Sequence, residues 1–554
     1  MKRSIHLFAS FLILSSFASF AQQQVVQGTL GTINRTTPKT GFNTNGHMPA
    51  NFPSGNLGAN WTQQAFIDST AYLNPDILRF PGGTNTNHWD WQTGWYKPGY
   101  QPPFPALTIR ADEFKPGLTA ATAEGIYVLN LETSNVSYEM DGVRHIDSLG
   151  MNPTMIELGN EHNLSNTAYP LQFMTSAGYA QLAKTYYDSV KAILPAAKVC
   201  VVGSNTSQRP SWHSDILAQN PAIDAFAWHA YMNANNADLV FNVNRALAAA
   251  FGNAFYAGSL ANRYQVGGFN TLPAGKEIWV TEYNLWETQI SSAPVIAGTW
   301  THFLYLNGLH QYFLSNPRVT LFLNHSLGCI DSWHEAISRV DHHITANGIA
   351  MKLLADVSKG SQTCQDITFS GNPSMIYGST TIPKLTGWKF SFTNMEKGFI
   401  CNYSSDTFRL SLSSVFTNPV QFDEYSADTA FVVHGLSGIN KYTGTSADTV
   451  VIYPFSFTQL NSSSATGITQ QVSNKASSLW IYPNPGNDVI TIKNSFDLQH
   501  AEIAICNLTG QEIKKINGIT GDTFKITTGE FAPGAYLIKI KSSDQLATAK
   551  FFID

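Results

Sequence analysis

The sequence predicts an α/β protein in which a (β/α)8 TIM barrel is followed by a β-sandwich and a smaller all-β region. Three observations predict this order. Over residues 25–350, short apolar runs that end in polar residues alternate with longer stretches of helical periodicity, as in parallel sheets. Over residues 351–462 the helical periodicity stops and short alternating strands appear. A polar segment then precedes a last β-rich region, which begins near residue 479.

Eight strands are expected in the barrel. Seven of them are clear apolar runs, which span Ile77–Phe80, Gly125–Leu131, Met155–Leu158, Val199–Gly203, Ala225–Ala230, Glu277–Thr281 and Val319–Asn324. A poorly marked first strand before Gly46 brings the number to eight, which closes a (β/α)8 barrel. Helices are expected between the strands, for example over Tyr179–Leu194 and Ala293–Leu314. An open doubly wound sheet is the alternative, but no GxGxxG turn follows an early strand.

Composition and periodicity divide the chain into five segments. We expect a signal peptide over residues 1–21, the barrel over 22–350, the β-sandwich over 351–462, a linker over 463–478 and a last all-β domain over 479–554. Strands expected in the sandwich include Gly387–Phe392, Gly398–Tyr403 and Thr449–Phe457. The linker is predicted because it is polar and poor in hydrophobic residues.

The first residues have the pattern of a secretory signal peptide. Lys2 and Arg3 precede an apolar run over Leu7–Phe20, and small residues at Ser19 and Ala21 close it. Cleavage is expected after Ala21. A membrane anchor is the alternative, but the run is shorter than the roughly 20 residues that a membrane-spanning helix needs. No other stretch is long and apolar enough to span a bilayer, so the mature chain is expected to cross no membrane.

Composition limits the class of partner. A formal net charge of −5 and the lack of a concentrated Lys/Arg cluster argue against a nucleic-acid binder. Aromatic residues make up 12% of the chain while only 13% are charged, which suits a cleft that stacks on flat, hydroxylated ligands. Five cysteines are too few for a disulfide scaffold, but Cys364 and Cys401 lie in one segment and are open to pairing.

The last region resembles the C-terminal sorting domain of the bacterial type IX secretion system, an Ig-like all-β domain. Three motifs carry the resemblance, in the expected order: Tyr482–Pro485 (YPNP), Asn507–Gln511 (NLTGQ) and Pro533–Leu537 (PGAYL). The resemblance implies recognition by the type IX machinery and export through the periplasm and the outer membrane. The protein would then be secreted or attached to the cell surface. A generic Ig-like adhesion module is the alternative.

Two glutamates stand where a barrel enzyme carries its catalytic groups. The fourth strand runs into Glu161 and the seventh into Glu282. Catalytic side chains in barrels lie at the carboxyl ends of strands, so these two carboxylates are expected to face each other across one cleft. Cleavage of a glycosidic bond needs such a pair, one protonated to donate to the leaving oxygen and one ionised to attack the anomeric carbon.

Other strand ends offer groups that would keep one carboxylate ionised. Arg79 ends the second strand, and His229 and Tyr231 end the sixth. Glu157 shares the strand of Glu161 but lies deeper, so we expect it to be a buried partner inside the barrel. Glu132, at the end of the third strand, is open between a binding subsite and a scaffold role.

Four motifs at these strand ends resemble the retaining clan A glycoside hydrolases, and most of all their α-L-arabinofuranosidase-like branch. They are RFPGG at 79–83, GNE at 159–161, WHAY at 228–231 and TEYN at 281–284. A β-sandwich directly after the barrel is also typical of the branch. One departure is Tyr283-Asn284 after the second glutamate, where many arabinofuranosidases carry a tryptophan; this departure concerns the choice of sugar and not the mechanism.

The resemblance implies a role for each matching residue. Glu161 would be the general acid/base and Glu282 the nucleophile. Asn160 would hydrogen-bond the sugar 2-hydroxyl. Arg79 would keep Glu282 ionised, while Tyr231 and His229 would orient it. Among aromatic residues, Trp95, with Trp89 and Trp91, is expected either to stack on sugar rings or to pack within its own loop.

Other chemistries fit the sequence less well. His334-Glu335 would begin a zinc-protease HExxH motif, but Ser338 occupies the second ligand position. Asp341-His342-His343 is read as a solvated loop, and no GxSxG elbow is present. We therefore expect neither a metal nor a cofactor.

The sequence predicts a secreted retaining glycoside hydrolase acting on a polysaccharide or oligosaccharide. The alternative is a non-catalytic carbohydrate-binding or surface-adhesion protein on a barrel scaffold, which has no need of both Glu161 and Glu282.

Overall fold

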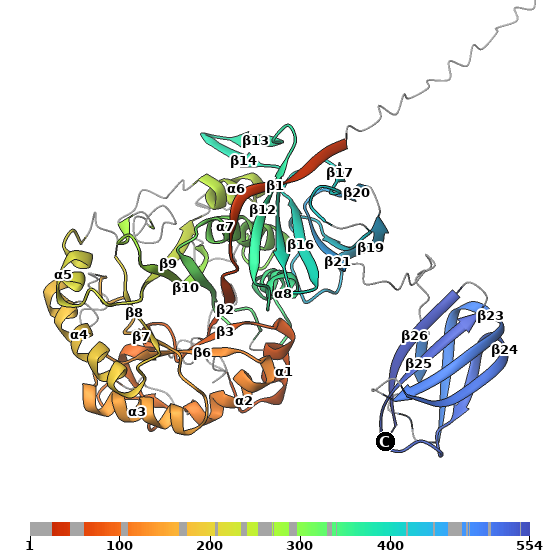
Figure 1. Cartoon of the computed structure of the whole chain (residues 1–554), viewed down its shortest axis with the longest axis horizontal. Helices are drawn as coiled ribbons and strands as arrows, with labels where there is room; N and C mark the ends of the chain where they lie inside the picture. The colour runs from red at the N-terminus through yellow and green to blue at the C-terminus, as the bar shows by residue number, and fades with distance from the viewer. Residues whose placement is uncertain are drawn as a thin grey trace, which may run out of the picture. The chain divides into compact units, whose positions relative to one another are not determined.

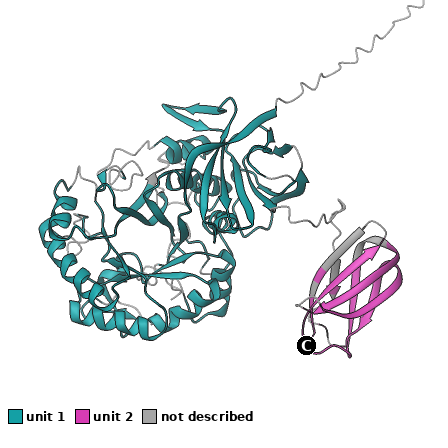
Figure 2. Cartoon of the chain, viewed as in Figure 1, with its two compact units in different colours: residues 1–464 teal, residues 465–554 magenta. Residues whose placement is uncertain are grey.

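The computed structural model forms two compact units, residues 1–464 and 465–554, which are described separately (Figure 2). Its described residues are 25–44, 60–100, 109–164, 174–204, 209–233, 241–252, 269, 271–286, 296–328, 335–338, 341–416, 419–446, 449–463, 479–482, 486, 488–507, 511–542 and 545–553. The predicted signal peptide and nearly all of the predicted linker lie outside these residues. No helix in the described part of the chain is long and apolar enough to cross a membrane.

A closed barrel of parallel strands forms the larger part of the first unit (Figure 1). In chain order its strands are β2 (Lys39–Asn43), β3 (Ile77–Phe80), β6 (Glu124–Leu129), β7 (Met155–Leu158), β8 (Lys198–Val202), β9 (Ala225–Asn233), β10 (Glu277–Trp286) and β11 (Val319–His325). All seven apolar runs are strands, so the predicted barrel is confirmed. The unmarked first strand is β2, which is hard to recognise because Phe42 is its one large apolar residue. At Gly41 a Cβ would lie 1.8 Å from the Ile77 carbonyl oxygen, so only glycine fits there.

Helices follow the strands and form an outer ring around the barrel (Figure 1). They are α1 (Gln64–Leu73), α2 (Ala111–Ala121), α3 (Val136–Ser148), α4 (Ser176–Ile193), α5 (Trp212–Gln219), α6 (Val243–Gly252), α7 (Trp300–Ser315) and α8 (Ala346–Ser358). Between β3 and α2 the chain forms a 3-10 helix, η1 (Thr84–His88), and a small hairpin of β4 (Trp89–Asp90) and β5 (Trp95–Tyr96). The predicted helix over Tyr179–Leu194 coincides with most of α4. The described part of the prediction over Ala293–Leu314 coincides with α7.

The barrel interior is apolar at its amino-terminal end and polar at its carboxyl end. Nine buried residues form a separate apolar cluster inside it: Ile77, Ile126, Met155, Cys200, Ala225, Ala227, Trp279, Leu321 and Leu323. Beyond this cluster the strands present Arg79 and Glu157, both with 0% exposure. Large buried charged groups require partners, so this end of the barrel is where a polar network must form.

The second part of the first unit is a β-sandwich of nine strands, in the order β19-β18-β21-β16-β15-β12-β1-β17-β20. These are β1 (Val25–Thr36), β12 (Thr363–Phe369), β15 (Leu385–Ser391), β16 (Met395–Asn402), β17 (Phe408–Ser411), β18 (Val420–Ser426), β19 (Asn440–Ser446), β20 (Thr449–Ile452) and β21 (Ser456–Ser463). A short hairpin, β13 (Ser374–Tyr377) with β14 (Thr380–Pro383), follows β12 along the chain and contacts α6. Residues from both ends of the strand order share one core, which includes Ile400, Leu410 and Leu460.

The first strand corrects the predicted domain limits. We expected residues 22–350 to lie in the barrel, but β1 pairs antiparallel with β12 and parallel with β17, both in the sandwich. Its burial alternates along the strand, and Val26 and Leu30 pack on the sandwich core. Alternation over most of a strand suits a sheet that is covered on one face, whereas a barrel strand is buried on both; in β1 it is interrupted at Leu30–Gly31, where the register with β12 shifts. At the other limit, α8 continues the barrel to Ser358, beyond the predicted end at residue 350.

Cys364 and Cys401 do not form a disulfide; both are free, buried thiols. The strand register gives the reason. Cys364 is opposite Phe390 on β15, and Phe390 is opposite Lys397 on β16, four residues away from Cys401. The strand β15 therefore lies between the two cysteines, which are also offset by four residues along the strands, beyond the reach of a disulfide.

The helix α7 joins the barrel to the sandwich. It is buried around nearly its whole circumference, because the barrel covers one side and the sandwich the other. The Trp300 indole nitrogen donates to the Phe455 carbonyl oxygen at 2.7 Å, and the Trp388 indole nitrogen donates to Gln311 Oε1 at 2.8 Å. A helix that is apolar on all sides is stable only when it is enclosed, so the barrel and the sandwich form one folded body.

The second unit is an antiparallel β domain with its own core. Its strands are β22 (Leu479–Tyr482), β23 (Val489–Asn507), β24 (Glu512–Thr527), β25 (Gly534–Ser542) and β26 (Gln545–Ile553). They pair in the order β22-β23-β25-β26, and β24 also pairs with β23. The core contains Ile490, Ile492, Ile503, Ile505, Ile538 and Ile540. Residues 483–485 and 508–510 of the predicted sorting motifs lie outside the described residues.

We predict that truncation after Ser478 leaves the first unit folded. The residues of the second core are all drawn from β22 to β26 and the turns between them, so the first unit loses none of its own core. Calorimetry should give the truncated chain a main transition within about 2 °C of the full-length value, corresponding to under about 1 kcal/mol. Aggregation of the truncated chain, or a much lower midpoint, would show that the first unit depends on the second.

Candidate active site

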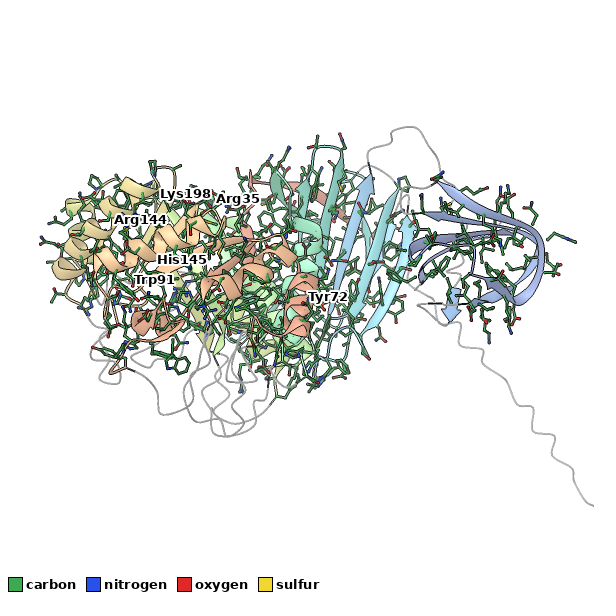
Figure 3. The ribbon with its side chains drawn as sticks, turned by 90° about the horizontal axis from the view of Figure 1, so that it is seen from below. Arg35, Tyr72, Trp91, Arg144, His145 and Lys198 are labelled. Carbon is green, nitrogen blue, oxygen red and sulfur yellow. The ribbon has the colours of Figure 1, made fainter. Side chains whose placement is uncertain are left out.

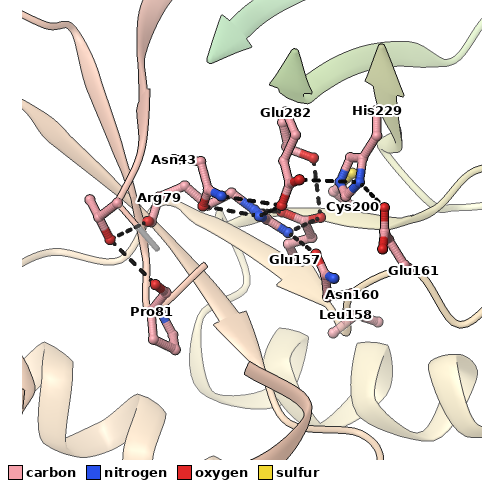
Figure 4. Close-up of polar contacts among 12 residues, drawn as sticks. Asn43, Arg79, Pro81, Glu157, Leu158, Asn160, Glu161, Cys200, His229 and Glu282 are labelled. Carbon is pink, nitrogen blue, oxygen red and sulfur yellow. Dashed lines mark hydrogen bonds and ion pairs between the residues drawn. The ribbon is translucent and has the colours of Figure 1, made fainter. Parts of the chain in front are cut away.

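Side chains from six strand ends meet at the carboxyl end of the barrel, and Figure 4 shows those of Asn43, Arg79, Glu161, His229 and Glu282. Asn43 ends β2, Arg79 lies in β3, Glu161 follows β7, Glu282 lies in β10 and His325 ends β11. His229 and Tyr231, both in β9, complete the group. With the exception of Trp95, the structure therefore brings together every residue that the sequence predicts for the site.

Arg79 is the centre of the hydrogen-bond network, and its side chain is fully buried. Nε and Nη2 donate to the two carboxylate oxygens of Glu157 at 2.7 and 3.0 Å. Nη1 donates to Glu282 Oε1 at 2.9 Å and to Asn43 Oδ1 at 3.1 Å. Nη2 also donates to Asn160 Oδ1 at 2.9 Å, so all five N–H groups of the guanidinium have an acceptor. Burial alone would lower the pKa of Arg79, but the charges of Glu157 and Glu282 outweigh it and raise the pKa.

Glu282 is held in its ionised form. Besides the bond from Arg79, its Oε1 accepts from Asn43 Nδ2 at 3.2 Å, and its Oε2 accepts from the Tyr231 hydroxyl at 2.6 Å. His229 Nδ1 and His325 Nδ1 lie 3.6 and 3.4 Å from Oε2. Burial favours the neutral acid, but the positive groups His229, His325 and Arg79 and the Tyr231 hydrogen bond lower the pKa of Glu282 to about 2.

Glu161 has a different setting. Its side chain is 17% exposed, against 6% for Glu282, and its Oε1 lies 2.8 Å from His229 Nδ1. Its backbone has a φ of 54°, which is in the left-handed region, and Gly159 two residues earlier has a φ of 80°. A Cβ at position 159 would lie 2.2 Å from His162 Nε2, so the turn that presents Glu161 requires glycine.

His229 stands between the two carboxylates. Burial of its imidazole lowers its pKa, but the neighbouring Glu282 and Glu161 outweigh burial and raise it. One ligand atom from each of Glu161, His229 and Glu282 lies within 4.8 Å of the other two. Three such atoms are able to bind a cation, but the Arg79 guanidinium already neutralises Glu282, which disfavours a second positive charge there.

Trp95 and Glu132 make none of the hydrogen bonds described above: Trp95 lies in the β4–β5 hairpin, and Glu132 lies in the turn after β6. Trp95 is 6% exposed in the β4–β5 hairpin, where its ring packs edge-on against Tyr96 with centroids 5.2 Å apart. This agrees with a loop that packs on its own aromatic residues. The Glu132 carboxylate oxygens are buried without a hydrogen-bond partner among the described residues, and burial raises its pKa to about 7.

Sequence reasoning missed Asn43 and His325. Asn43 Nδ2 lies 2.7 Å from His325 Nδ1 and also donates to Glu282, so the pair connects the first and last strands to this carboxylate. Both end their strands, which is the signal that identified the other residues. Asn43 was missed because its strand has little apolar character. Glu157 is a buried barrel-interior partner, as the sequence predicts.

Asn284, at the position where the sequence departs from the arabinofuranosidase pattern, has buried hydrogen-bond partners on two elements. Its side chain is fully buried, and its Oδ1 accepts from His302 Nε2 of α7 at 2.8 Å. Its Nδ2 donates to the His325 carbonyl oxygen. The residue after Tyr283 therefore braces the ends of β10 and β11.

Comparison with solved structures shows the same fold in several glycosidases. An α-L-arabinofuranosidase from Thermotoga maritima, in complex with arabinose, is 14% identical with a TM-score of 0.59. A family 51 α-L-arabinofuranosidase from Bifidobacterium longum is 12% identical with a TM-score of 0.57. Each match covers 79% of this chain and 99% of the other. A 4-O-α-L-rhamnosyl-β-D-glucuronidase from Fusarium oxysporum is 14% identical, with a TM-score of 0.51 and coverage of 78% and 99%. At these identities the likeness establishes the fold, and no curated protein sequence matches the chain.

The C-terminal unit matches a family model over residues 480–554, described as a secretion system C-terminal sorting domain. The predicted sorting domain is thereby confirmed. Such a domain directs a protein through the type IX machinery to the cell surface or the outside, which fixes the location of the chain.

We predict that Arg79→Ala destabilises the fold by about 3–5 kcal/mol, because it leaves Glu157 buried without its partner. Urea unfolding measures this at pH 7. Arg144→Ala is the matched control, since Arg144 makes a single exposed ion pair with Asp141 on the outer face of α3 (Figure 3). That variant should lose at most about 1 kcal/mol. Equal losses in both variants would mean that Arg79 contributes no more than a surface ion pair.

Proposed function

We propose that the protein is a retaining glycoside hydrolase that cleaves O-glycosidic bonds in an extracellular polysaccharide or oligosaccharide. One observation carries the proposal: Glu161 and Glu282, from the ends of two different barrel strands, both lie beside His229 Nδ1, and the pKa of Glu282 is strongly lowered. Glycosidases depend on such an unequal pair, because one carboxyl must attack as an anion while the other supplies a proton.

The spacing of the pair supports double displacement. Oxygens of Glu161 and Glu282 come within 4.8 Å of each other. Retaining enzymes hold their carboxyl groups about 5–5.5 Å apart, whereas inverting enzymes need roughly 6.5–9.5 Å to admit a water molecule. We infer that Glu282 attacks the anomeric carbon while Glu161 protonates the leaving oxygen. Glu161 then removes a proton from the water that hydrolyses the glycosyl-enzyme.

The surrounding groups suit these roles. Arg79, Asn43 and Tyr231 all donate to Glu282, so they keep it ionised before attack. The negative charge of Glu282 decreases as its carboxylate bonds to the sugar, so these hydrogen bonds weaken during the attack. Asn160 accepts from Arg79 through Oδ1, which turns its Nδ2 donor away from Arg79. We propose that this amide binds the sugar 2-hydroxyl beside Glu161.

An α-L-arabinofuranoside is the substrate class we test first. Two of the structures that share this fold are α-L-arabinofuranosidases, and one holds arabinose. The Fusarium relative in fold acts on a rhamnosyl-glucuronide, so the scaffold serves more than one sugar. A non-catalytic carbohydrate-binding or adhesion protein is the alternative. It is disfavoured because a buried carboxylate kept ionised by several donors is costly and serves no purpose in a binder.

We predict net retention of configuration. The purified protein is first screened on nitrophenyl glycosides, beginning with 4-nitrophenyl α-L-arabinofuranoside, and on plant and algal polysaccharides. Proton NMR of the first-formed anomer on the best substrate then gives the stereochemistry. Retention is expected because the carboxyl spacing leaves no room for a direct water attack. A first product of inverted configuration would refute Glu282 as nucleophile.

Two variants separate the roles of the glutamates and serve as controls for the stereochemical result. Glu282→Ala should abolish hydrolysis, and added azide should restore a product of inverted configuration. Glu161→Ala should retain activity on dinitrophenyl glycosides, whose leaving group needs no proton, and azide should there give a product of retained configuration. The reverse pattern would exchange the two assignments. Complete absence of turnover by wild type on the whole panel would favour the binding alternative.

We also predict that Tyr231→Phe moves the acid limb of the pH profile of kcat/KM upward by about one unit. Tyr231 donates to ionised Glu282, and loss of a hydrogen bond to a charged group costs about 1.5–3 kcal/mol. The pKa of Glu282 therefore rises, and the carboxylate is protonated at a higher pH than in wild type. Tyr186→Phe is the control, since Tyr186 is also buried but donates to the Asn130 carbonyl oxygen. An unchanged acid limb in Tyr231→Phe would contradict the assignment.

A further inference from the structure

The side chain of Asn87 forms two hydrogen bonds with the backbone of Asn160. Asn87 lies in η1, directly after β3, and is fully buried. Its Nδ2 donates to the Asn160 carbonyl oxygen at 2.9 Å, and the Asn160 N–H donates to its Oδ1 at 3.3 Å. An amide side chain that meets both polar groups of one backbone residue imitates a strand partner and fixes that residue's position and orientation.

Asn160 lies between two residues whose backbone is in the left-handed region. Gly159 has a φ of 80° and Glu161 a φ of 54°. A non-glycine residue in the left-handed region costs about 1–2 kcal/mol, and such a conformation persists only when its surroundings impose it. Glu161 gains a further backbone bond from Leu164 N–H at 3.0 Å, on its C-terminal side. On the N-terminal side, Asn87 supplies the backbone restraint next to Glu161.

The segment that carries Asn87 is itself anchored. The Thr133 hydroxyl donates to the Asn87 carbonyl oxygen at 2.8 Å, and Asn130 Nδ2 donates to the Trp89 carbonyl oxygen at 2.9 Å. Both anchors lie in the turn after β6. The turn after β6 therefore fixes the position of Asn87. Through its two bonds to Asn160, Asn87 in turn restrains the backbone next to Glu161.

We propose that Asn87 is a positioning residue for the general acid/base: its two hydrogen bonds to Asn160 hold the Glu161 carboxyl in line with the glycosidic oxygen. The inference rests on the proposed glycosidase activity. A displaced Glu161 protonates its leaving group poorly, while Glu282, held by Arg79 and Tyr231, still attacks. The Asn160 side chain is also held by the hydrogen bond from Arg79 to its Oδ1, so its contact with the sugar is kept when Asn87 is replaced. Loss of the two Asn87 bonds should therefore slow mainly the reactions that need the acid.

The test compares leaving groups. We would measure kcat/KM of wild type and Asn87→Ala on phenyl and 2,4-dinitrophenyl glycosides of the sugar that wild type cleaves best. Asn87→Ala should lose about tenfold or more on the phenyl glycoside and under about threefold on the dinitrophenyl glycoside. Asn85→Ala is the matched control: Asn85 is also buried in η1, but its Oδ1 accepts from the Tyr96 hydroxyl at 2.6 Å. Its two losses should be equal.

Asn87→Asp provides a second variant of the same size, in case the alanine variant is unstable. Aspartate keeps the acceptor for the Asn160 N–H but has no donor for the Asn160 carbonyl oxygen. It should show the same dependence on the leaving group. Equal losses on both glycosides, or wild-type rates on both, would overturn the inference while leaving the glycosidase assignment intact. An inactive wild type would instead overturn the proposed function.

Discussion

The buried positive charge of Arg79 is the constraint on which the site depends. A guanidinium without solvent contact is stable only when each N–H meets an acceptor, and here the acceptors come from β2, β7, β10 and the turn after β7. The same contacts that satisfy the arginine fix the directions of Asn43, Asn160 and Glu282. Among the described residues no hydrogen bond joins Glu161 to Arg79; its Oε1 lies instead 2.8 Å from His229 Nδ1, which is 3.6 Å from Glu282 Oε2. The two carboxylates therefore differ in their surroundings: Glu282 is hydrogen-bonded to Arg79, Asn43 and Tyr231 and lies beside His229 and His325, whereas the side chain of Glu161 is hydrogen-bonded to His229.

The sandwich contributes to this arrangement although it supplies none of the central side chains. Its loops accept hydrogen bonds from the first turn of α7, and α7 supplies His302, which donates to Asn284 beside the Glu282 strand end. Asn284 in turn holds the His325 carbonyl oxygen. A continuous set of buried hydrogen bonds thus leads from the sandwich to the ends of β10 and β11. This explains in physical terms why a barrel with these strand ends is joined to a β-sandwich over a fully enclosed helix.

Much of this was predictable from the sequence, for identifiable reasons. Buried barrel strands are apolar runs, so polar residues at their ends stand out, and Arg79, Glu161, His229 and Glu282 were found that way. Asn43 was missed because its short strand carries one large apolar residue. Asn87 gives no sequence signal at all: its role depends on the path of a 3-10 helix between strands. The place of β1 and the separation of Cys364 from Cys401 depend on long-range register, which local patterns do not contain.

The pairing of β1 with strands more than 320 residues later has a consequence for how the chain folds. β1 is followed after two residues by β2, the first barrel strand, yet its partners β12 and β17 are among the last parts of this unit to be synthesised. Contacts of such high sequence separation form slowly, because a long loop must close first. The strand β1, which directly precedes the first barrel strand β2, therefore stays unpaired until β12 and β17 have been synthesised. For a chain that is sent to the cell surface, the fold of this unit is therefore complete only after nearly all of the unit has been synthesised.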